Sequence, residues 1–306
     1  MAMKSRSVSD KRATSVPRFS DADVTPGDIM RYLETVEELP TLSAVAVRIN
    51  TMLQDMDTTA DELAAVVEKD PAIVTKLLKL TNSSFFGFSA KVSNTAHAVM
   101  ILGYNTVLNA VLSMAVIDAM AGPGKQSGLN MKAFWRHAVS VGVVSRYLSR
   151  TLEGHRHENA FTAGIVHDIG KIVMARFFTG RFMELTSCVN EERISFRTAE
   201  KRLFPIGHDA IGAFLARRWN LPNDLSAAIA QHHHPDMMPD VNHLALVVHT
   251  ADIIVNIHVE GRSPVEQWSL CQPAKALFGE TVQTLDEWLP AISEEIGTAC
   301  QLMLES

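Results

Sequence analysis

The sequence lacks several features that define common protein classes. It has only three cysteines among 306 residues, Cys188, Cys271 and Cys300, and they show no close spacing of the metal or redox kind, which fits a reducing cytosol. No apolar run reaches the roughly 18 to 20 residues that cross a bilayer, and the polar N-terminal segment lacks the apolar stretch of a signal peptide. We therefore expect a soluble, cytoplasmic protein that makes no membrane contact.

The chain also lacks an excess of positive charge. Its 28 Lys and Arg residues stand against 34 Asp and Glu residues, a net charge of −6, so we expect no direct binding to the phosphate backbone of nucleic acids. Alternating strand patterns and internal repeats are missing as well. What the composition does provide is 47% hydrophobic residues, enough to fill a sizeable core in about two domains.

Apolar residues recur at helical spacing from about residue 26 onward, which predicts an all-α fold. Helix starts are predicted at Thr25-Pro26, at the capping box Thr59-Ala60-Asp61-Glu62 and at Asp70-Pro71. Pro40 is expected to stop the first helix, and further helical patterns cover residues 95–102 and 105–120.

Glycine and proline interrupt the helical patterns at AGPGKQSGLN, which predicts a boundary between two lobes. The expected organisation is a disordered tail at 1–24, an N-terminal helical lobe at 25–120, a Gly/Pro linker at 121–130, a second lobe at 131–260 and a C-terminal helical extension at 261–306. Eleven of the 12 histidines lie beyond the linker, so we expect the chemistry in the second lobe. The extension's apolar pattern suggests a helix docked on the body or on another subunit, which leaves a homodimer open.

Possible metal ligands lie on or beside apolar helical segments of the second lobe. They are His137, His167, Asp168, His208, His232, His233 and Asp252. Asp252 lies in a helix that is apolar nearly all round, where an unpaired carboxylate would cost several kcal/mol, so it needs a partner. Imidazole and carboxylate donors without thiolates suit Fe, Mn, Zn, Co or Ni. We therefore predict a divalent transition metal site that holds one ion or two.

Two adjacent ions would let a bridging hydroxide attack a phosphoester. Lys171 lies one turn beyond Asp168 and could contact a phosphate oxygen, so these two residues are the catalytic candidates if the protein is an enzyme. Simpler interpretations remain for each residue. His137 could be a core histidine, His208 could cap its helix, the run 232–234 could be a solvated corner, and Lys171 could extend to solvent.

The ordered motifs resemble the HDOD domain over roughly residues 26 to 260. The N-terminal lobe is similar at Leu39-Pro40, Asp70-Pro71, Asn82-Ser83, Phe86-Gly87 and Leu102-Gly103, and the second lobe is similar through FTAGIVHDIGKIVM and the HH segment. This resemblance implies an all-helical HD-like lobe with an N-terminal helical bundle packed on it. It also implies kinship with the HD and HD-GYP metal-dependent phosphohydrolases, although HDOD proteins mostly serve bacterial signalling and gene regulation without an established catalytic activity.

The resemblance assigns roles position by position. His137, His167, Asp168 and Asp252 match the basic HD metal set. His208, His232 and His233 match the positions where HD-GYP enzymes hold a second metal, and Lys171 matches their HD-x-G-K lysine. Two departures argue against hydrolysis of a cyclic dinucleotide: HHHPDMMPD replaces the His-His-Glu and Gly-Tyr-Pro signature, and Ala133 stands where some HD-GYP proteins carry an acidic ligand. Metal binding is unaffected by either departure.

Two functions follow as expectations from the sequence. The first is a bacterial signal-transduction or regulatory protein, in which the second lobe senses a metal or ligand and the N-terminal lobe contacts a signalling partner. The second is a metal-dependent phosphohydrolase that acts on a nucleotide or on a phosphodiester. A structural scaffold with an empty cavity is a third reading.

Overall fold

The computed structural model describes residues 24–55, 57–83, 91–121, 128–152, 157–237, 242–262 and 269–304. Within these ranges all regular structure is helical and no strand occurs, which confirms the all-α class. Most of the predicted tail and linker, residues 1–23 and 122–127, lies outside the described ranges, and so does Phe86-Gly87.

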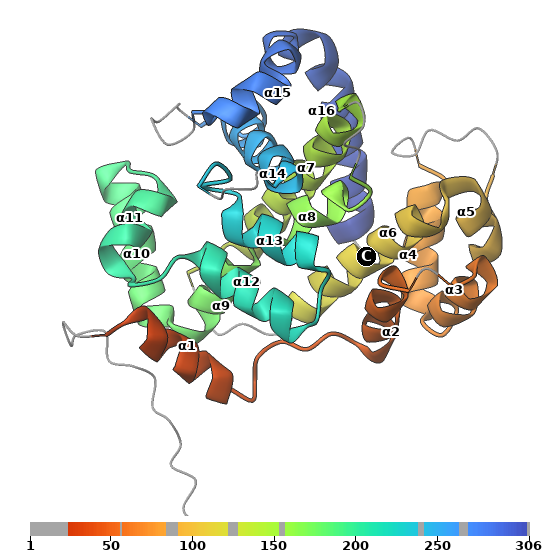
Figure 1. Ribbon diagram of the computed structural model, residues 1–306, viewed down its shortest axis with the longest axis horizontal. Coiled ribbons are helices and arrows are strands. Elements are labelled where there is room, and N and C mark those ends of the chain that lie inside the picture. The colour runs from red at the N-terminus through yellow and green to blue at the C-terminus, as the bar shows by residue number, and fades with distance from the viewer. Residues whose placement is uncertain are drawn as a thin grey trace, which may run out of the picture.

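The N-terminal helices begin where the capping signals predict. They are α1 (Pro26–Thr35), α2 (Ala44–Leu53), α3 (Ala60–Val67), α4 (Pro71–Thr81), α5 (Thr95–Leu102) and α6 (Tyr104–Met120). Thr25 and Thr59 form capping boxes, and the Asp70 side chain accepts hydrogen bonds from the first-turn amides of α4. Helices α2 to α6 pack on one another as one bundle, which occupies the orange and yellow side of Figure 1.

Beyond the bundle, one long helix, α7, is the helix on which several others pack. The following helices are α7 (Met131–Thr151), α8 (Ala160–Val166), α9 (Ile169–Phe177), α10 (Thr179–Glu192), α11 (Phe196–Leu203), α12 (His208–Arg218), α13 (Asn223–Gln231), α14 (His243–Ile254), the π-helix η1 (Val255–Val259), α15 (Gln272–Gln283) and α16 (Leu285–Leu304). Helices α8, α14 and α16 all pack against α7, while α12 packs against α9 and α13. We call the group α7 to α14 the α7–α14 lobe.

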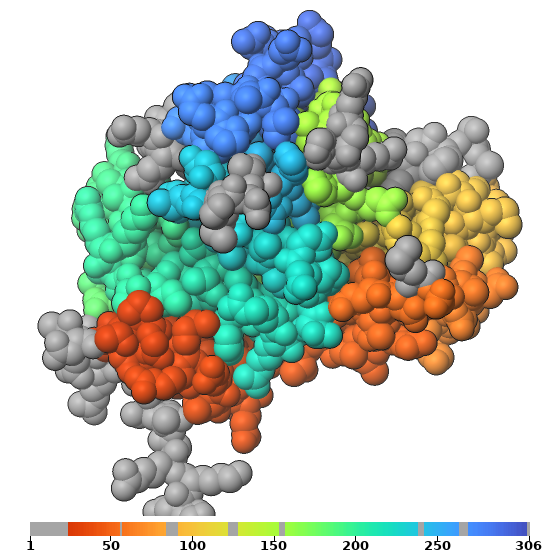
Figure 2. Space-filling view, viewed as in Figure 1, coloured from red at the N-terminus to blue at the C-terminus, as the bar shows by residue number. Residues whose placement is uncertain are grey.

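Helix α1 packs on the α7–α14 lobe, although the sequence groups it with the N-terminal lobe. The ring edge of Tyr32 contacts Phe178, with centroids 5.6 Å apart, and Figure 1 and Figure 2 show α1, in red, below the green and teal helices. The helix ends at Thr35, earlier than Pro40 predicted, because Val36 has extended backbone angles. The segment after α1 therefore crosses from the α7–α14 lobe to the α2–α6 bundle.

Two glycine contacts bring the helices of the α7–α14 lobe unusually close. A Cβ atom at Gly164 in α8 would lie 2.5 Å from the Cα of Gly142 in α7. A Cβ atom at Gly170 in α9 would lie 1.9 Å from the carbonyl oxygen of His208. Since no residue with a side chain fits at such distances, glycine is required at both crossings. The junction between α8 and α9 is thereby held against both α7 and α12.

The C-terminal helix α16 docks on the body of the same chain. Trp288 stacks on Tyr147 of α7, with ring centroids 4.3 Å apart, and Arg146 forms an ion pair with Glu295 at 2.7 Å. Its apolar face is buried, as the pattern at its apolar positions predicts. Of the two dockings expected from the sequence, the contact with the body is the one this structure contains.

Among the described residues, no single helix is both long enough and apolar enough to span a membrane. Helices α5 and α6 reach that length and composition only as a pair, and the pair is bent by 118°. Most residues of α6 are buried inside the protein.

Candidate metal centre

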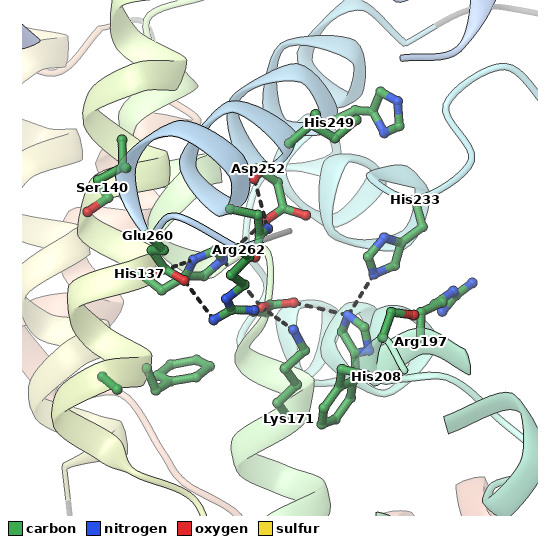
Figure 3. A pocket seen from close by; sticks show the side chains of 18 of the residues that line it. His137, Ser140, Lys171, Arg197, His208, His233, His249, Asp252, Glu260 and Arg262 are labelled. Carbon is green, nitrogen blue, oxygen red and sulfur yellow. Dashed lines mark hydrogen bonds and ion pairs between the residues drawn. The ribbon is translucent and has the colours of Figure 1, made fainter. Parts of the chain in front are cut away.

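A cavity of about 800 Å³ opens in the α7–α14 lobe (Figure 3), and five of the seven predicted ligands line it: His137, Asp168, His208, His233 and Asp252. The donor atoms of all seven form two groups, and within each group all donors lie within 4.8 Å of one another. The first group is His137, His167 and Asp252, and the second is Asp168, His208, His232 and His233. All seven residues that the sequence singles out are therefore brought to one place.

Helix ends supply four of these donors. His167 directly follows α8 and Asp168 precedes α9, so the pair occupies the junction between the two helices. His208 is the first residue of α12, and His232 directly follows α13. All four side chains are almost completely buried. Because the chain changes direction at each of these points, side chains from several helices can converge on one volume.

The carboxylate of Asp168 lies between the two groups. Its Oδ2 is 3.3 Å from Nε2 of His167 and 3.9 Å from Nε2 of His137. Its Oδ1 is 3.0 Å from Nε2 of His208 and 3.7 Å from Nε2 of His232. One oxygen thus faces each group, which is the arrangement of a carboxylate that bridges two neighbouring cations.

Two buried histidines turn their Nε2 atoms toward this carboxylate. Nδ1 of His167 bonds the carbonyl oxygen of Gly164 at 2.7 Å, and Nδ1 of His232 bonds that of Ile229 at 2.8 Å. A carbonyl oxygen only accepts, so each Nδ1 carries a proton and donates it outward, which leaves Nε2 as the ring atom that faces the site. Burial and the charges of neighbouring histidines lower the pKa of His232 to about 3. Among the described residues neither Nε2 atom has a hydrogen-bond partner, yet both face Asp168, and a cation would satisfy all three groups.

Two further carboxylates, which the sequence analysis missed, hold two of the three remaining histidines from outside. Nδ1 of His137 lies 3.0 Å from Glu260, and Nδ1 of His208 lies 2.8 Å from Glu200. Burial acts to lower the pKa of each histidine, but hydrogen bonds to Asp252 and Glu260 raise that of His137 to about 9, and the charge of Glu200 helps raise that of His208 to about 9. The site therefore favours positive charge beside both groups.

Outer contacts also fix Asp252 and His232. Nδ2 of Asn256, in the π-helix, donates to Oδ1 of Asp252 at 2.7 Å, and that oxygen lies 3.1 Å from Nε2 of His137. Nδ1 of His249 donates to the carbonyl oxygen of His232 at 2.8 Å. His249 lines the cavity wall but belongs to neither donor group.

Lys171 points into the cavity and is not extended to solvent. Its ammonium donates a hydrogen bond to Oδ2 of Asp168 and lies 4.7 Å from the centre of the Phe196 ring. The cavity is lined by four more basic side chains, Arg136, Arg197, Lys201 and Arg262. These positive charges around the cavity favour the binding of an anionic ligand next to the buried donor groups.

Comparison with known proteins assigns the chain to a family. The HDOD domain matches residues 39–235, more than half of the chain. The chain belongs to the HDOD family. A curated relative is an uncharacterized protein of Treponema pallidum, 25% identical over 236 residues that make up 76% of this chain and 45% of the relative, so the HDOD chain spans less than half of that protein's length.

Solved structures share the fold. An HDOD domain protein of unknown function from Geobacter sulfurreducens is 25% identical, with a TM-score of 0.76 over 88% of this chain and 96% of its own. A protein of Marinobacter aquaeolei, provisionally named for signal transduction, is 23% identical, with a TM-score of 0.72 over 90% of this chain and 61% of its own. A protein of Shewanella amazonensis, provisionally named a phosphohydrolase, is 24% identical, with a TM-score of 0.67 over 89% and 96%. The latter two likenesses show the fold alone.

Proposed function

We propose that this HDOD protein is a bacterial regulatory protein whose α7–α14 lobe binds two divalent transition metal ions and a phosphate-bearing ligand, and whose α2–α6 bundle passes that state to a protein partner. The observation that carries the metal part is the pair of buried Nε2 atoms of His167 and His232, which have no hydrogen-bond partner among the described residues and face the two oxygens of Asp168 at 3.3 and 3.7 Å. Buried polar atoms without a partner are costly, and a cation between these nitrogens and the carboxylate would satisfy all three groups.

The donor set fits such ions. One ion would be held by His137, His167, Asp252 and Oδ2 of Asp168, and the other by Oδ1 of Asp168 with the three remaining histidines of the site. Imidazole and carboxylate donors suit Mn, Fe, Co, Ni or Zn. Bound ions would supply Lewis acidity toward a phosphate oxygen, while Lys171 and the basic side chains around the cavity hold the anion in place.

The regulatory part rests on helix α12, which connects the donors to the α2–α6 bundle. Its first residue is His208, and its other end is held by α2. There, Nδ2 of Asn50 donates to the carbonyl oxygens of Trp219 and Asn220 at 3.2 and 2.7 Å, and Nε2 of Gln54 donates to that of Asn220 at 3.0 Å. A shift of His208 on metal binding would therefore move a helix whose far end is fastened to the bundle. Relatives of this fold include a protein provisionally named for signal transduction, which agrees with such a role.

A second candidate function is phosphoester hydrolysis. It is favoured by the position of Lys171, whose ammonium lies at Oδ2 of Asp168 on the cavity side, and by provisional names of two Shewanella amazonensis proteins of this fold as phosphohydrolases. Ala133 lines the cavity but offers no donor, and no glutamate directly follows the paired histidines. A cyclic dinucleotide is for these reasons the less favoured substrate.

Metal analysis of protein purified without a histidine tag tests the proposal first. We expect up to two transition metal ions per chain, and loss of both in the double variant His167→Ala, Asp168→Ala. Metal-free protein that also fails to take up added Mn²⁺, Fe²⁺ or Zn²⁺ would sink both functions. Metal-loaded protein that hydrolyses members of a phosphoester panel would favour the enzyme. Metal-loaded protein that binds inorganic phosphate but hydrolyses no member of the panel would favour the regulator.

Amide hydrogen exchange tests the connection through α12. Added metal should slow exchange in α12 and also in α2, because the two helices share hydrogen bonds. In Asn50→Ala, protection should stay in α12 and no longer reach α2. Equal protection of α2 in wild type and variant would show that this contact carries no signal.

A further inference from the structure

Glu200, the carboxylate outside the second donor group, has both of its oxygens hydrogen-bonded or ion-paired. Oε1 of Glu200 lies 2.8 Å from Nδ1 of His208 and also accepts that residue's backbone N–H at 2.7 Å. Its Oε2 lies 3.1 Å from Nη1 of Arg197, which reaches Asp209 with its other nitrogen at 3.0 Å. Glu200 is 1% exposed. A carboxylate at this depth is stable only because both oxygens are bonded.

Glu260, the carboxylate outside the first donor group, has the same kind of contacts on the opposite wall of the cavity. Oε1 of Glu260 lies 3.0 Å from Nδ1 of His137, and its Oε2 lies 2.6 Å from Nη2 of Arg262 (Figure 3). Glu260 and Arg262 lie in the turn that follows the π-helix. In this turn Gly261 has a φ of +65°, and the amide of Arg262 donates to the carbonyl oxygen of Asn256 at 2.9 Å. Each donor group thus has its own chain of histidine, glutamate and arginine, although the two chains come from unrelated segments.

We infer that Glu200 and Glu260 are positioning residues, one for each of the two metal ions of the proposed function. A carboxylate that accepts from Nδ1 keeps the proton on that nitrogen, aims Nε2 into the site and makes Nε2 a stronger donor. Arg197 and Arg262 hold the far oxygen of each glutamate so that its near oxygen stays on the ring. His167 and His232 use backbone carbonyls for the same purpose, so only one histidine on each side of Asp168 depends on a charged partner.

A purely structural role makes a different prediction. Glu200 also accepts the first amide of α12, so its loss could simply loosen that helix and weaken the whole site. Glutamine separates the two roles, because its carbonyl oxygen still accepts both N–H groups while its charge is gone. A positioning role predicts that each glutamine variant weakens one ion, whereas a structural role predicts that both ions weaken together or that neither changes.

The experiment is a Zn²⁺ titration of chelator-stripped protein against a chromophoric competitor, with the absorption spectrum of bound Co²⁺ as a second measure. Glu260→Gln and Glu200→Gln should each weaken one of the two ions by about 10- to 100-fold and leave the other within about twofold of wild type. In a His208→Ala background, Glu260→Gln should still weaken the remaining ion, and Glu200→Gln should not. Glu295→Gln is the matched control, since Glu295, on α16, pairs with Arg146 of α7 and neither residue lines the cavity.

The outcomes separate this inference from the proposed function on which it rests. Wild-type protein that binds no ion would sink the proposed function. Wild-type protein that binds two ions, with both glutamine variants equal to Glu295→Gln or with both ions weakened in each variant, would overturn the positioning role alone. Far-ultraviolet circular dichroism identifies a misfolded variant, and in that event the other glutamate, on its own segment, decides the matter.

Discussion

The backbone of Gly170 lies directly against the carbonyl oxygen of His208, so close that a Cβ atom at residue 170 would stand 1.9 Å from that oxygen and 2.8 Å from the amide nitrogen of Gly212. This contact fastens α9 to α12 beside the site. It places Asp168, two residues earlier, 3.0 Å from the imidazole of His208. The glycine in HDIGK therefore sets the distance between the two halves of the donor set.

Gly170→Ala should destabilise the protein by about 3 kcal/mol, since α9 and α12 must separate to admit one methyl group. Gly279→Ala in α15 is the control, because its added methyl meets no atom within 4 Å and alanine favours a helix by up to about 1 kcal/mol. Denaturant unfolding of both variants measures the difference. Equal stability of the two variants would mean that the α9–α12 contact yields easily.

Asp168→Ala should remove both ions, because each oxygen of this carboxylate faces a different donor group. His233→Ala should remove at most one ion, since His233 belongs to the second group alone. His97→Ala in α5, outside both groups, should keep full metal content. Elemental analysis of the three tag-free proteins checks the ranking, and an Asp168→Ala protein that retains one ion would rule out the bridging role.

Metal-free protein should lose stability as pH rises from 6.5 toward about 9. The pKa values of His137 and His208 are raised to about 9 from an ordinary 6.5, so the stability that these charged rings contribute is fully present below 6.5 and is lost as pH passes the folded-state value. Metal affinity should strengthen over the same interval, because ions bind the neutral rings. Melting temperatures with and without Zn²⁺ should therefore diverge as pH increases; parallel curves would contradict the shifts.

Asn50→Ala should cost about 2 kcal/mol, because it removes a donor from the buried carbonyl oxygen of Trp219 and from the partly buried one of Asn220. Gln54→Ala, which removes one more exposed hydrogen bond to Asn220, should cost less. Denaturant midpoints of the two variants give the comparison. If Gln54→Ala proves the more harmful, the junction depends on the exposed bond instead.

Much of the fold can be predicted from interactions between residues that are close together in the sequence. Thr25, Thr59 and Asp70 cap helices where their side chains predict it, since a cap acts within one turn of the chain. The packing of α1 on the α7–α14 lobe was not readable in this way. Its apolar face shows that the helix must be covered, but the contact between Tyr32 and Phe178 depends on tertiary structure that no local pattern encodes.

The residues of the site also fall into those that the sequence predicts and those that only the structure reveals. The seven donors are visible because histidine and aspartate are unusual on apolar helices. Glu200 and Glu260 were missed because both lie in charged surroundings, FRTAEKRL and VEGR, where acidic residues are ordinarily solvated. Only the structure shows that one of them is buried with both oxygens bonded, and only the packing of α11 and the π-helix brings them to the histidines.

The donors reach the site from points as far apart in the chain as His137 on α7 and Asp252 on α14. No shorter piece of the polypeptide carries the complete set, although the second donor group lies within residues 168–233 and only the first needs both His137 and Asp252. Cobalt added during refolding would therefore gain its protein-bound colour in two steps, and the second step would report when α7 and α14 come together.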